Sequence, residues 1–204
     1  MEKNLLTHVS KWIHMYPKRN NELNVLQLYL KDYKKKFYLR EISVLTKIPL
    51  KTTQNIVGAL ENAKILKSTI EGKNKYFALH LDTLETKWYL THAELYKTQL
   101  FLRKYPLFST FLKALRTDGM IVLFGSFAKG TATKDSDCDL LILSDKKEEL
   151  PLHLLPYKVH DIRMTLESYK KAKDETLIKE IEENHIIFNN HSTYINLQWR
   201  KYGQ

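Results

Sequence analysis

The sequence predicts a mixed α/β (α+β) protein in two parts, and three observations lead to this fold class. In the first 85 residues, apolar residues recur at helical spacing in short stretches and then alternate on both sides of a Gly-Lys-Asn turn. Beyond residue 106, short apolar runs that suit buried strands alternate with helical stretches. Between them, residues 84–103 form one long helical pattern. We therefore expect domains over 1–85 and 106–204, joined by a helix over 86–105.

The composition is typical of a globular protein without a membrane-spanning segment. Apolar residues make up 43% of the 204 residues, and the longest apolar run, Met120 to Phe124, is far short of the roughly 18 residues that cross a bilayer. The first residues hold no apolar block typical of a secretion signal. The single cysteine, Cys138, has no partner for an internal disulfide, which is typical of a reducing compartment. We expect a cytoplasmic protein.

The positive charge is concentrated in the first part. The net charge is +10, and residues 1–85 hold 15 Lys/Arg against 8 Asp/Glu, whereas the remainder holds 18 against 15. Such an excess favours a polyanionic partner, because each Lys or Arg that neutralises a phosphate releases counterions. A solvated lysine-rich surface explains the composition equally well.

The first part reads as a defined series of short elements. A helix within 23–33 is followed by a short extended stretch at 37–39. Two further helices, over 40–46 and 50–62, are separated by a turn at Pro49, and two alternating segments, 65–70 and 75–79, form a hairpin.

Residues 39–79 resemble the winged helix-turn-helix of small prokaryotic regulators. In that family the second of the paired helices enters the DNA major groove and the hairpin lies along the backbone, which implies double-stranded DNA as a partner. The resemblance implies DNA contacts from the start of the third helix and from the wing: Lys51, Thr52, Thr53, Gln54, Asn55, Lys73 and Lys75. The alternative is that Thr52 or Thr53 caps the helix and that the other residues are solvated.

The long helix over 84–103 carries Trp88, Leu95, Tyr96 and Leu102 among its apolar positions, and Trp88 is expected to pack inside the protein. The helix either connects the two domains or packs within the first one as its last helix. Both options stay open from the sequence.

The second part alternates strands and helices. We expect strands at 120–124, 139–143 and 159–165, a helix over 166–184 and a last short strand at 186–188. A short helix over 106–116 precedes them. This order predicts a small mixed sheet flanked by helices.

Two short motifs in this part carry chemistry. Gly125-Ser126 follows a strand and precedes a helix, so that backbone N–H groups and a hydroxyl can approach a phosphate. Asp137 and Asp139 stand two residues apart on an extended segment, which directs both carboxylates to one face. Paired carboxylates suit Mg²⁺, which takes oxygen ligands and shares them with substrate phosphates.

The stretch GSFAKGTATKDSDCDLLIL resembles the signature of the DNA polymerase β-like nucleotidyltransferases, over roughly residues 106–190. The resemblance implies an NTP substrate, phosphate binding by Gly125 and Ser126, and Mg²⁺ at Asp137 and Asp139. Lys129 is expected either to reach a phosphate or to face solvent.

The third carboxylate of that family's enzymes is the point of departure. It activates the attacking hydroxyl from the neighbouring strand, and Asp161 is the only acid on residues 157–165. Aligning the end of this strand with the family pattern instead places His160 or Ile162 at that position. Because side chains alternate along a strand, a shift of one residue turns Asp161 away, whereas a bulge restores it. Asp161 is therefore the candidate catalytic base, with this alternative left open.

Three functions follow as hypotheses. The first is an enzyme that transfers a nucleoside monophosphate from an NTP to an unknown acceptor. The second is a DNA-binding regulator whose nucleotidyltransferase-like domain binds nucleotide or is inactive. The third is a partner-binding module, paired with a small helical protein. Since winged helices commonly read two half-sites, a homodimer is a further option.

Overall fold

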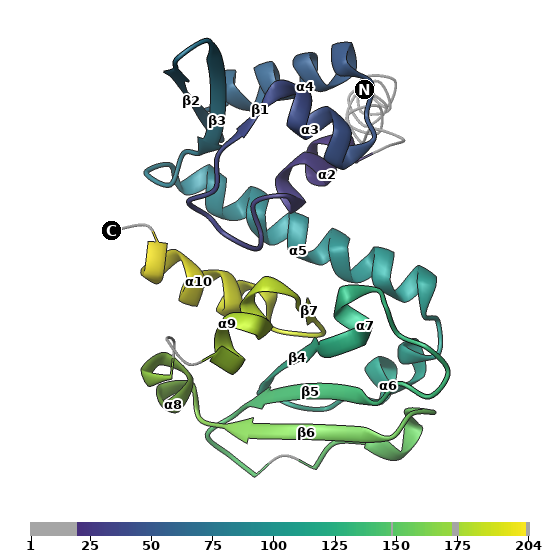
Figure 1. Ribbon diagram of the computed structural model, residues 1–204. Helices are drawn as coiled ribbons and strands as arrows, with labels where there is room; N and C mark the ends of the chain where they lie inside the picture. Colours follow the sequence, from purple (N-terminus) through teal and green to yellow (C-terminus); the bar gives the residue numbers. More distant parts are fainter. Residues whose placement is uncertain (1–19, 148, 173–175, 203–204) are drawn as a thin grey trace, which may run out of the picture.

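A computed structural model of the chain describes residues 20–147, 149–172 and 176–202. Within these ranges the chain forms a three-stranded sheet in its first part and a four-stranded sheet in its second (Figure 1). The long helix α5 (Leu84–Lys104) runs between them. The expected fold class, a mixed α/β protein with a small mixed sheet flanked by helices, is confirmed for the second part.

The first part has the expected order of elements. These are α2 (Asn21–Gln27), β1 (Phe37–Tyr38), α3 (Leu39–Thr46), α4 (Leu50–Asn62), β2 (Leu66–Glu71) and β3 (Asn74–Leu79). Strand β3 pairs antiparallel with both β1 and β2, and Gly72, with φ at +62°, makes the hairpin turn. Helix α2 is shorter than its apolar pattern, because residues 28–31 continue as turns. The likeness of this arrangement to a winged helix stays a prediction.

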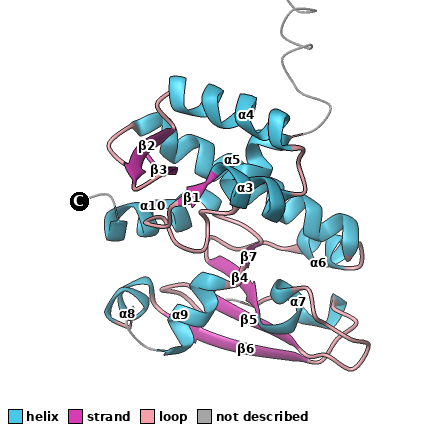
Figure 2. Ribbon diagram, turned by 45° about the horizontal axis from the view of Figure 1, so that its top comes forward, coloured by secondary structure: helices cyan, strands magenta, loops and turns pink. Residues whose placement is uncertain are grey.

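The second part is built around the sheet β6-β5-β4-β7. Its elements are α6 (Phe108–Ala114), β4 (Met120–Phe124), α7 (Gly125–Lys129), β5 (Cys138–Leu143), a 3₁₀ turn (Leu152–Leu154), β6 (Val159–Met164), α8 (Leu166–Lys171), α9 (Thr176–Glu183), β7 (Ile186–Ile187) and α10 (His191–Tyr202). Strands β5 and β6 are parallel, and the other neighbours are antiparallel. Figure 2 shows α7, α8 and α9 lying along the side of this sheet that faces the first part.

Two expectations about the helices were incomplete. The helix expected over 166–184 is two helices, α8 and α9, and α10 was not predicted. Helix α10 is rich in polar residues and buries Tyr194, Ile195 and Gln198, so its sequence carries only a weak apolar stripe. Tertiary packing rather than pattern holds this helix in place.

The sheet of the second part separates two hydrophobic clusters. Val122 and Leu141 point into one cluster together with residues of α9 and α10, whereas Ile121 and Leu140 point into the other with aromatic residues of α6. This alternation follows from the period of two along a strand. Cys138 is fully buried in the second cluster, where it packs among apolar side chains.

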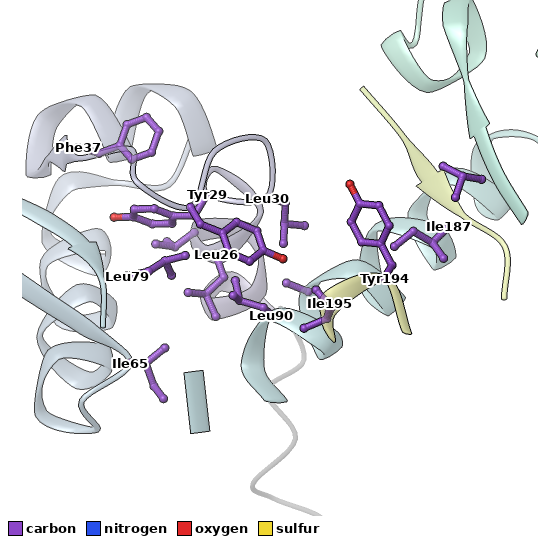
Figure 3. Packing of buried hydrophobic residues seen from close by; sticks show 14 of the residues in the cluster. Leu26, Tyr29, Leu30, Phe37, Ile65, Leu79, Leu90, Ile187, Tyr194 and Ile195 are labelled. Carbon is purple, nitrogen blue, oxygen red and sulfur yellow. The ribbon is translucent and has the colours of Figure 1, made fainter. Parts of the chain in front are cut away.

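The first of these clusters continues into the first part of the chain. Leu26 and Tyr29 lie in the same cluster as Tyr194 and Ile195, with Leu90 of α5 between them (Figure 3). Helix α5 contacts α2 on one side and α10 and β7 on the other. Helix α5 therefore contributes to the hydrophobic core of both parts of the chain as well as connecting them. The domain boundaries at 85 and 106 stay a prediction.

A buried polar network also ties α5 to the second part. Glu94 and His185 are both fully buried, and their Oε1 and Nε2 atoms lie 2.8 Å apart. His185 Nδ1 lies 2.8 Å from the carbonyl oxygen of Glu182. Burial acts to raise the pKa of Glu94, but the charges of His185 and Lys97 outweigh it and hold that pKa below its ordinary value. The ionised carboxylate is thus part of the folded core.

The outer face of α5 departs from the expected packing. Trp88, expected inside the protein, is 55% exposed, and Leu95 is 41% exposed. The helix instead buries Leu90, Ala93 and Phe101. Two of the four apolar positions expected on this helix are thus exposed, because the core uses a different stripe of the same helix.

Candidate functional site

The Gly-Ser and Asp-x-Asp motifs meet at one edge of the four-stranded sheet. Strands β4 and β5 are antiparallel, and Phe124, the last residue of β4, stands opposite Asp139 near the start of β5. Gly125 and Ser126 follow directly as the first residues of α7. The pairing of two strands therefore brings together motifs that are separated by ten residues in the sequence.

Gly125 is required by two features of this edge. Its φ is +66°, a backbone conformation that side chains with a Cβ rarely adopt. In addition, a Cβ at this position would lie 2.1 Å from Oδ2 of Asp139, which is far closer than any van der Waals contact. The carboxylate of Asp139 thus occupies the space that any other residue at 125 would fill.

The two predicted aspartates are partly exposed and have basic neighbours. The side chains of Asp137 and Asp139 are 36% and 29% exposed, and His160 Nδ1 lies 3.7 Å from Oδ2 of Asp137 and 3.8 Å from Oδ1 of Asp139. Lys158 Nζ lies 3.8 Å from Asp137. Burial raises the pKa of Asp139 above its ordinary value; His160 opposes this shift, while Asp137 and Glu180 add to it.

Lys129 lies on the last turn of α7 and is bound by an acid from another helix. Its Nζ forms an ion pair with Oε1 of Glu180 on α9, and both side chains are more than 40% exposed. Both charges are close enough to Asp139 to act on its pKa. Lys129 therefore lies beside the site, although in this structure its partner is a carboxylate of the chain.

The register of β6 corrects the expectation for Asp161. In the parallel pair, Asp139 stands beside His160 and Leu140 beside Asp161, with no bulge over Val159–Met164. Neighbours in register share a face, so Asp161 points to the side of the buried Leu140 and away from the aspartate pair. It pairs with Arg163 instead, through a contact of 2.5 Å. His160 occupies the position on β6 that faces the pair.

The structure adds three residues that the motif alone did not assign to the site: Lys158, His160 and Glu180. The strand alignment pointed to His160 or Ile162, and the register decides for His160. Glu180 had no local signal, because it lies on a helix 41 residues beyond Asp139.

The donor set was tested for a metal. Among the described residues, no group of three or more His, Cys, Asp and Glu side chains is arranged to hold an ion. A metal bound by the protein alone does not fit. The paired carboxylates of Asp137 and Asp139 do fit Mg²⁺, which commonly binds through one or two carboxylates and completes its shell with substrate phosphates and water.

This geometry agrees with the comparison to known families. Residues 107–195 match the family model of the nucleotidyltransferase domain. The matched stretch contains Gly125, Ser126, Asp137 and Asp139, and it spans somewhat less than half of the 204-residue chain. The chain matches no curated protein and no solved structure. The similarity supports nucleotidyl transfer as the chemistry of residues 107–195 and an NTP as the substrate.

A groove in the first part gathers most of the residues predicted to contact DNA. It has a volume of about 1120 Å³ and lies between α4 and the β2–β3 hairpin. Five of the seven predicted residues line it: Lys51, Gln54, Asn55, Lys73 and Lys75. Tyr38 and Arg40, which sequence reasoning did not single out, line it as well.

The structure corrects the prediction that Thr53 contacts DNA, whereas the same prediction for Thr52 and Lys75 stays untested. Thr53 is fully buried, and its hydroxyl donates to the carbonyl oxygens of Ile48 and Pro49 at 3.1 and 3.2 Å. It therefore fixes the turn before α4 and has no free surface for DNA. Thr52 is exposed, and Lys75 pairs with Glu61 at 2.9 Å across the groove wall.

Nothing in the described part of the chain resembles a membrane anchor of the helical kind, since none of its helices combines the length and apolar character needed to cross a bilayer.

Proposed function

We propose that the nucleotidyltransferase domain transfers a nucleoside monophosphate from an NTP to an acceptor, with Mg²⁺ held by Asp137 and Asp139. The close approach of Asp139 to Gly125 carries this proposal, because it brings a carboxylate for the metal directly beside the predicted phosphate cradle. The family match over residues 107–195 supports the NTP substrate.

The phosphates are assigned to the start of α7. Gly125 leaves the backbone accessible, and the Ser126 side chain forms no hydrogen bond with the described residues, so its hydroxyl is available to a ligand. Lys129 is one turn further on. We expect a bound triphosphate to draw its Nζ away from Glu180, because a phosphate offers more negative charge than one carboxylate.

The aspartates supply oxygen ligands and negative charge. When bound, Mg²⁺ neutralises charge on the phosphates and aligns the attacking and leaving oxygens. Burial and two neighbouring carboxylates raise the pKa of Asp139, so the site without a cation is electrostatically strained. His160 and Lys129 partly relieve that strain in this structure.

Proton removal from the acceptor is the weak step of this site. A third acid would deprotonate the attacking hydroxyl, but β6 presents His160 and turns Asp161 to the other face. We therefore expect nucleotide binding to be intact and transfer to be slow compared with a three-acid site.

Calorimetry with Mg²⁺-ATP and Mg²⁺-GTP tests the binding, and release of pyrophosphate tests the transfer. Binding should disappear in the double variant Asp137→Ala with Asp139→Ala. Asp161→Asn is the matched control, because it removes a carboxylate from the same pair of strands on the opposite face. Equal affinity in the double variant and the control would rule out this site.

A second candidate is a DNA-binding regulator whose nucleotidyltransferase domain senses a nucleotide. The groove between α4 and the hairpin supports it, since Arg40, Lys51 and Lys73 bring positive charge to a surface that also holds Gln54 and Asn55. Gln and Asn side chains can pair with adenine edges, and Lys binds phosphates. The order of elements supports the comparison of this part with a winged helix.

Binding to a labelled duplex, measured by fluorescence anisotropy with and without Mg²⁺-NTP, separates the two candidates. A regulator should bind duplex DNA with an affinity that changes when nucleotide is added. In the Asp137→Ala variant, nucleotide should no longer change that affinity. An enzyme that does not act on DNA should release pyrophosphate in the absence of any duplex. Absence of duplex binding even at low salt would exclude the regulator.

A further inference from the structure

A cavity of about 340 Å³ lies between α8, α9 and α10, and this volume is within the size range of small-molecule sites. Asp139 lies near the start of β5, whereas the parallel strand β6 ends beside the other end of β5, where α8 follows. Figure 1 accordingly shows α7 and α8 at opposite ends of the sheet. The cavity is therefore separate from the candidate nucleotidyltransferase site, and we propose that it binds a nucleoside monophosphate.

The floor of the cavity is a buried polar network around Glu182. Its Oε1 accepts hydrogen bonds from the hydroxyl of Tyr169 at 3.3 Å and from Nε2 of Gln198 at 3.1 Å. Its Oε2 accepts one from Nζ of Lys201 at 2.5 Å. Tyr169, Glu182 and Gln198 are only 4%, 8% and 4% exposed. Because these contacts join three helices, the floor is already formed before a ligand binds.

The network leaves one polar group for a ligand. A carboxylate only accepts hydrogen bonds, so the amide nitrogen of Gln198 faces Glu182. The amide oxygen of Gln198 remains, and it accepts no hydrogen bond from any residue that the structure describes. Since Gln198 lines the cavity, this oxygen can accept a hydrogen bond from an N–H group of the ligand.

The charge of the lining indicates an anionic ligand. Three cations, Lys170, Arg200 and Lys201, line the cavity together with one acid, Glu182. Lys201 is paired with Glu182, whereas Lys170 and Arg200 are exposed and form no ion pair within the described part of the chain. Two free cations from two helices match a phosphate monoester, which carries a charge of about −1.5 to −2 at neutral pH.

The apolar part of the lining decides against a bare anion. Leu197 and the ring of Tyr169 line the cavity, and an inorganic phosphate would leave them and the Gln198 oxygen without a contact. A nucleoside would leave the two free cations without a partner. A nucleoside monophosphate uses all three features, because its base offers both an apolar ring and N–H groups and its phosphate binds the cations.

Calorimetry of the full chain with AMP tests the proposal. The titration is carried out without Mg²⁺ on the variant Asp137→Ala with Asp139→Ala, so that the candidate nucleotidyltransferase site does not contribute. AMP has about 23 non-hydrogen atoms and should bind with a Kd of about 10–100 µM. The result is thus independent of whether the proposed transfer takes place.

Two charge-removing variants in the same background test the position of the phosphate. Arg200→Gln and Lys170→Gln should each weaken AMP binding by about tenfold, since each removes a charged contact. Lys171→Gln is the matched control, because Lys171 is the next residue of α8 but pairs with Glu167 at 2.8 Å and is not part of the cavity lining. Circular dichroism confirms that each variant is folded.

Adenosine and inorganic phosphate separate the two halves of the ligand, and each should bind at least about tenfold more weakly than AMP. Inorganic phosphate that binds as tightly as AMP would reduce the cavity to an anion site, and adenosine that binds as tightly would exclude a role for the cations. Absence of AMP binding at about 1 mM, or equal affinity in Arg200→Gln and Lys171→Gln, would likewise overturn the proposal.

Discussion

Replacing Gly125 with alanine is the sharpest single perturbation of the candidate site. The change adds one methyl group, but this methyl group meets two obstacles that the structure defines. The backbone at 125 has φ at +66°, and the new Cβ would lie 2.1 Å from Oδ2 and 3.0 Å from the carboxyl carbon of Asp139. Either the backbone or the Asp139 carboxylate must move.

The expected magnitude has two contributions. An alanine held in the left-handed region loses about 1–2 kcal/mol of stability from backbone strain alone. Displacing Asp139 also removes one charged oxygen from the metal and phosphate site, and a charged contact is worth about 1.5–3 kcal/mol. Gly125→Ala should therefore lower the affinity for Mg²⁺-NTP by about 10- to 100-fold.

Gly72→Ala provides the matched control for this experiment. Gly72 has nearly the same φ, +62°, but a Cβ there meets no atom within 4 Å. Urea unfolding should show a similar loss of about 1–2 kcal/mol in the control, while calorimetry should show unchanged nucleotide affinity. If Gly125→Ala matches the control in both stability and nucleotide affinity, Asp139 does not stand over the phosphate cradle and the site assignment fails.

Four further outcomes are expected. His160→Asp should place a third acid on the site face and raise pyrophosphate release, whereas Asp161→Asn should leave it unchanged; the reverse result in the transfer assay would restore Asp161. Because the pKa of Asp139 is raised in the fold, its ionised form destabilises the protein at neutral pH, so Asp139→Asn should raise the melting temperature while abolishing metal binding. Lys73→Ala should reduce the slope of log K for duplex DNA against log salt by about one; an unchanged slope excludes that contact. Because the pKa of Glu94 is lowered in the fold, its ionised carboxylate stabilises the protein at pH values above the ordinary pKa of 4.5, and this stabilisation is lost as the pH falls through the lowered pKa. Glu94→Gln should therefore destabilise the protein at pH 7, by up to about 3–5 kcal/mol, and make its stability depend less on pH in acid unfolding.

The motif positions could be predicted from the sequence because they depend on short-range rules. A strand that ends directly before Gly125 and an extended Asp137-x-Asp139 segment determine where the backbone turns and which face the carboxylates take. Only the antiparallel pairing of β4 with β5 was needed to bring them together. The strands β4, β5 and β6 accordingly lie within one residue of their predicted bounds.

The features that the sequence analysis missed depend on contacts between distant segments. Helix α10 is held in place because Tyr194 and Ile195 pack against α5 and the sheet. Its own residues show no clear helical periodicity from which the helix could have been predicted. The exposure of Trp88 follows from which stripe of α5 the cores on both sides select. The phosphate contact of Lys129 stays a prediction, but its partner in this structure, Glu180, can be found only once α9 is placed beside α7.

The position of His160 shows how one residue of register decides between two functions. Strands β5 and β6 are parallel and run in step from Cys138 beside Val159 to Leu143 beside Met164, so no single residue can slip without moving Ile162 and Met164 off their hydrophobic face. The packing of these two partly buried side chains against the core therefore holds His160 toward Asp137 and Asp139 and turns Asp161 away. The transfer proposed for this chain would therefore rest on two aspartates and an imidazole rather than on three acids. The change in pyrophosphate release in His160→Asp measures how much an acid at this position adds to the proposed transfer.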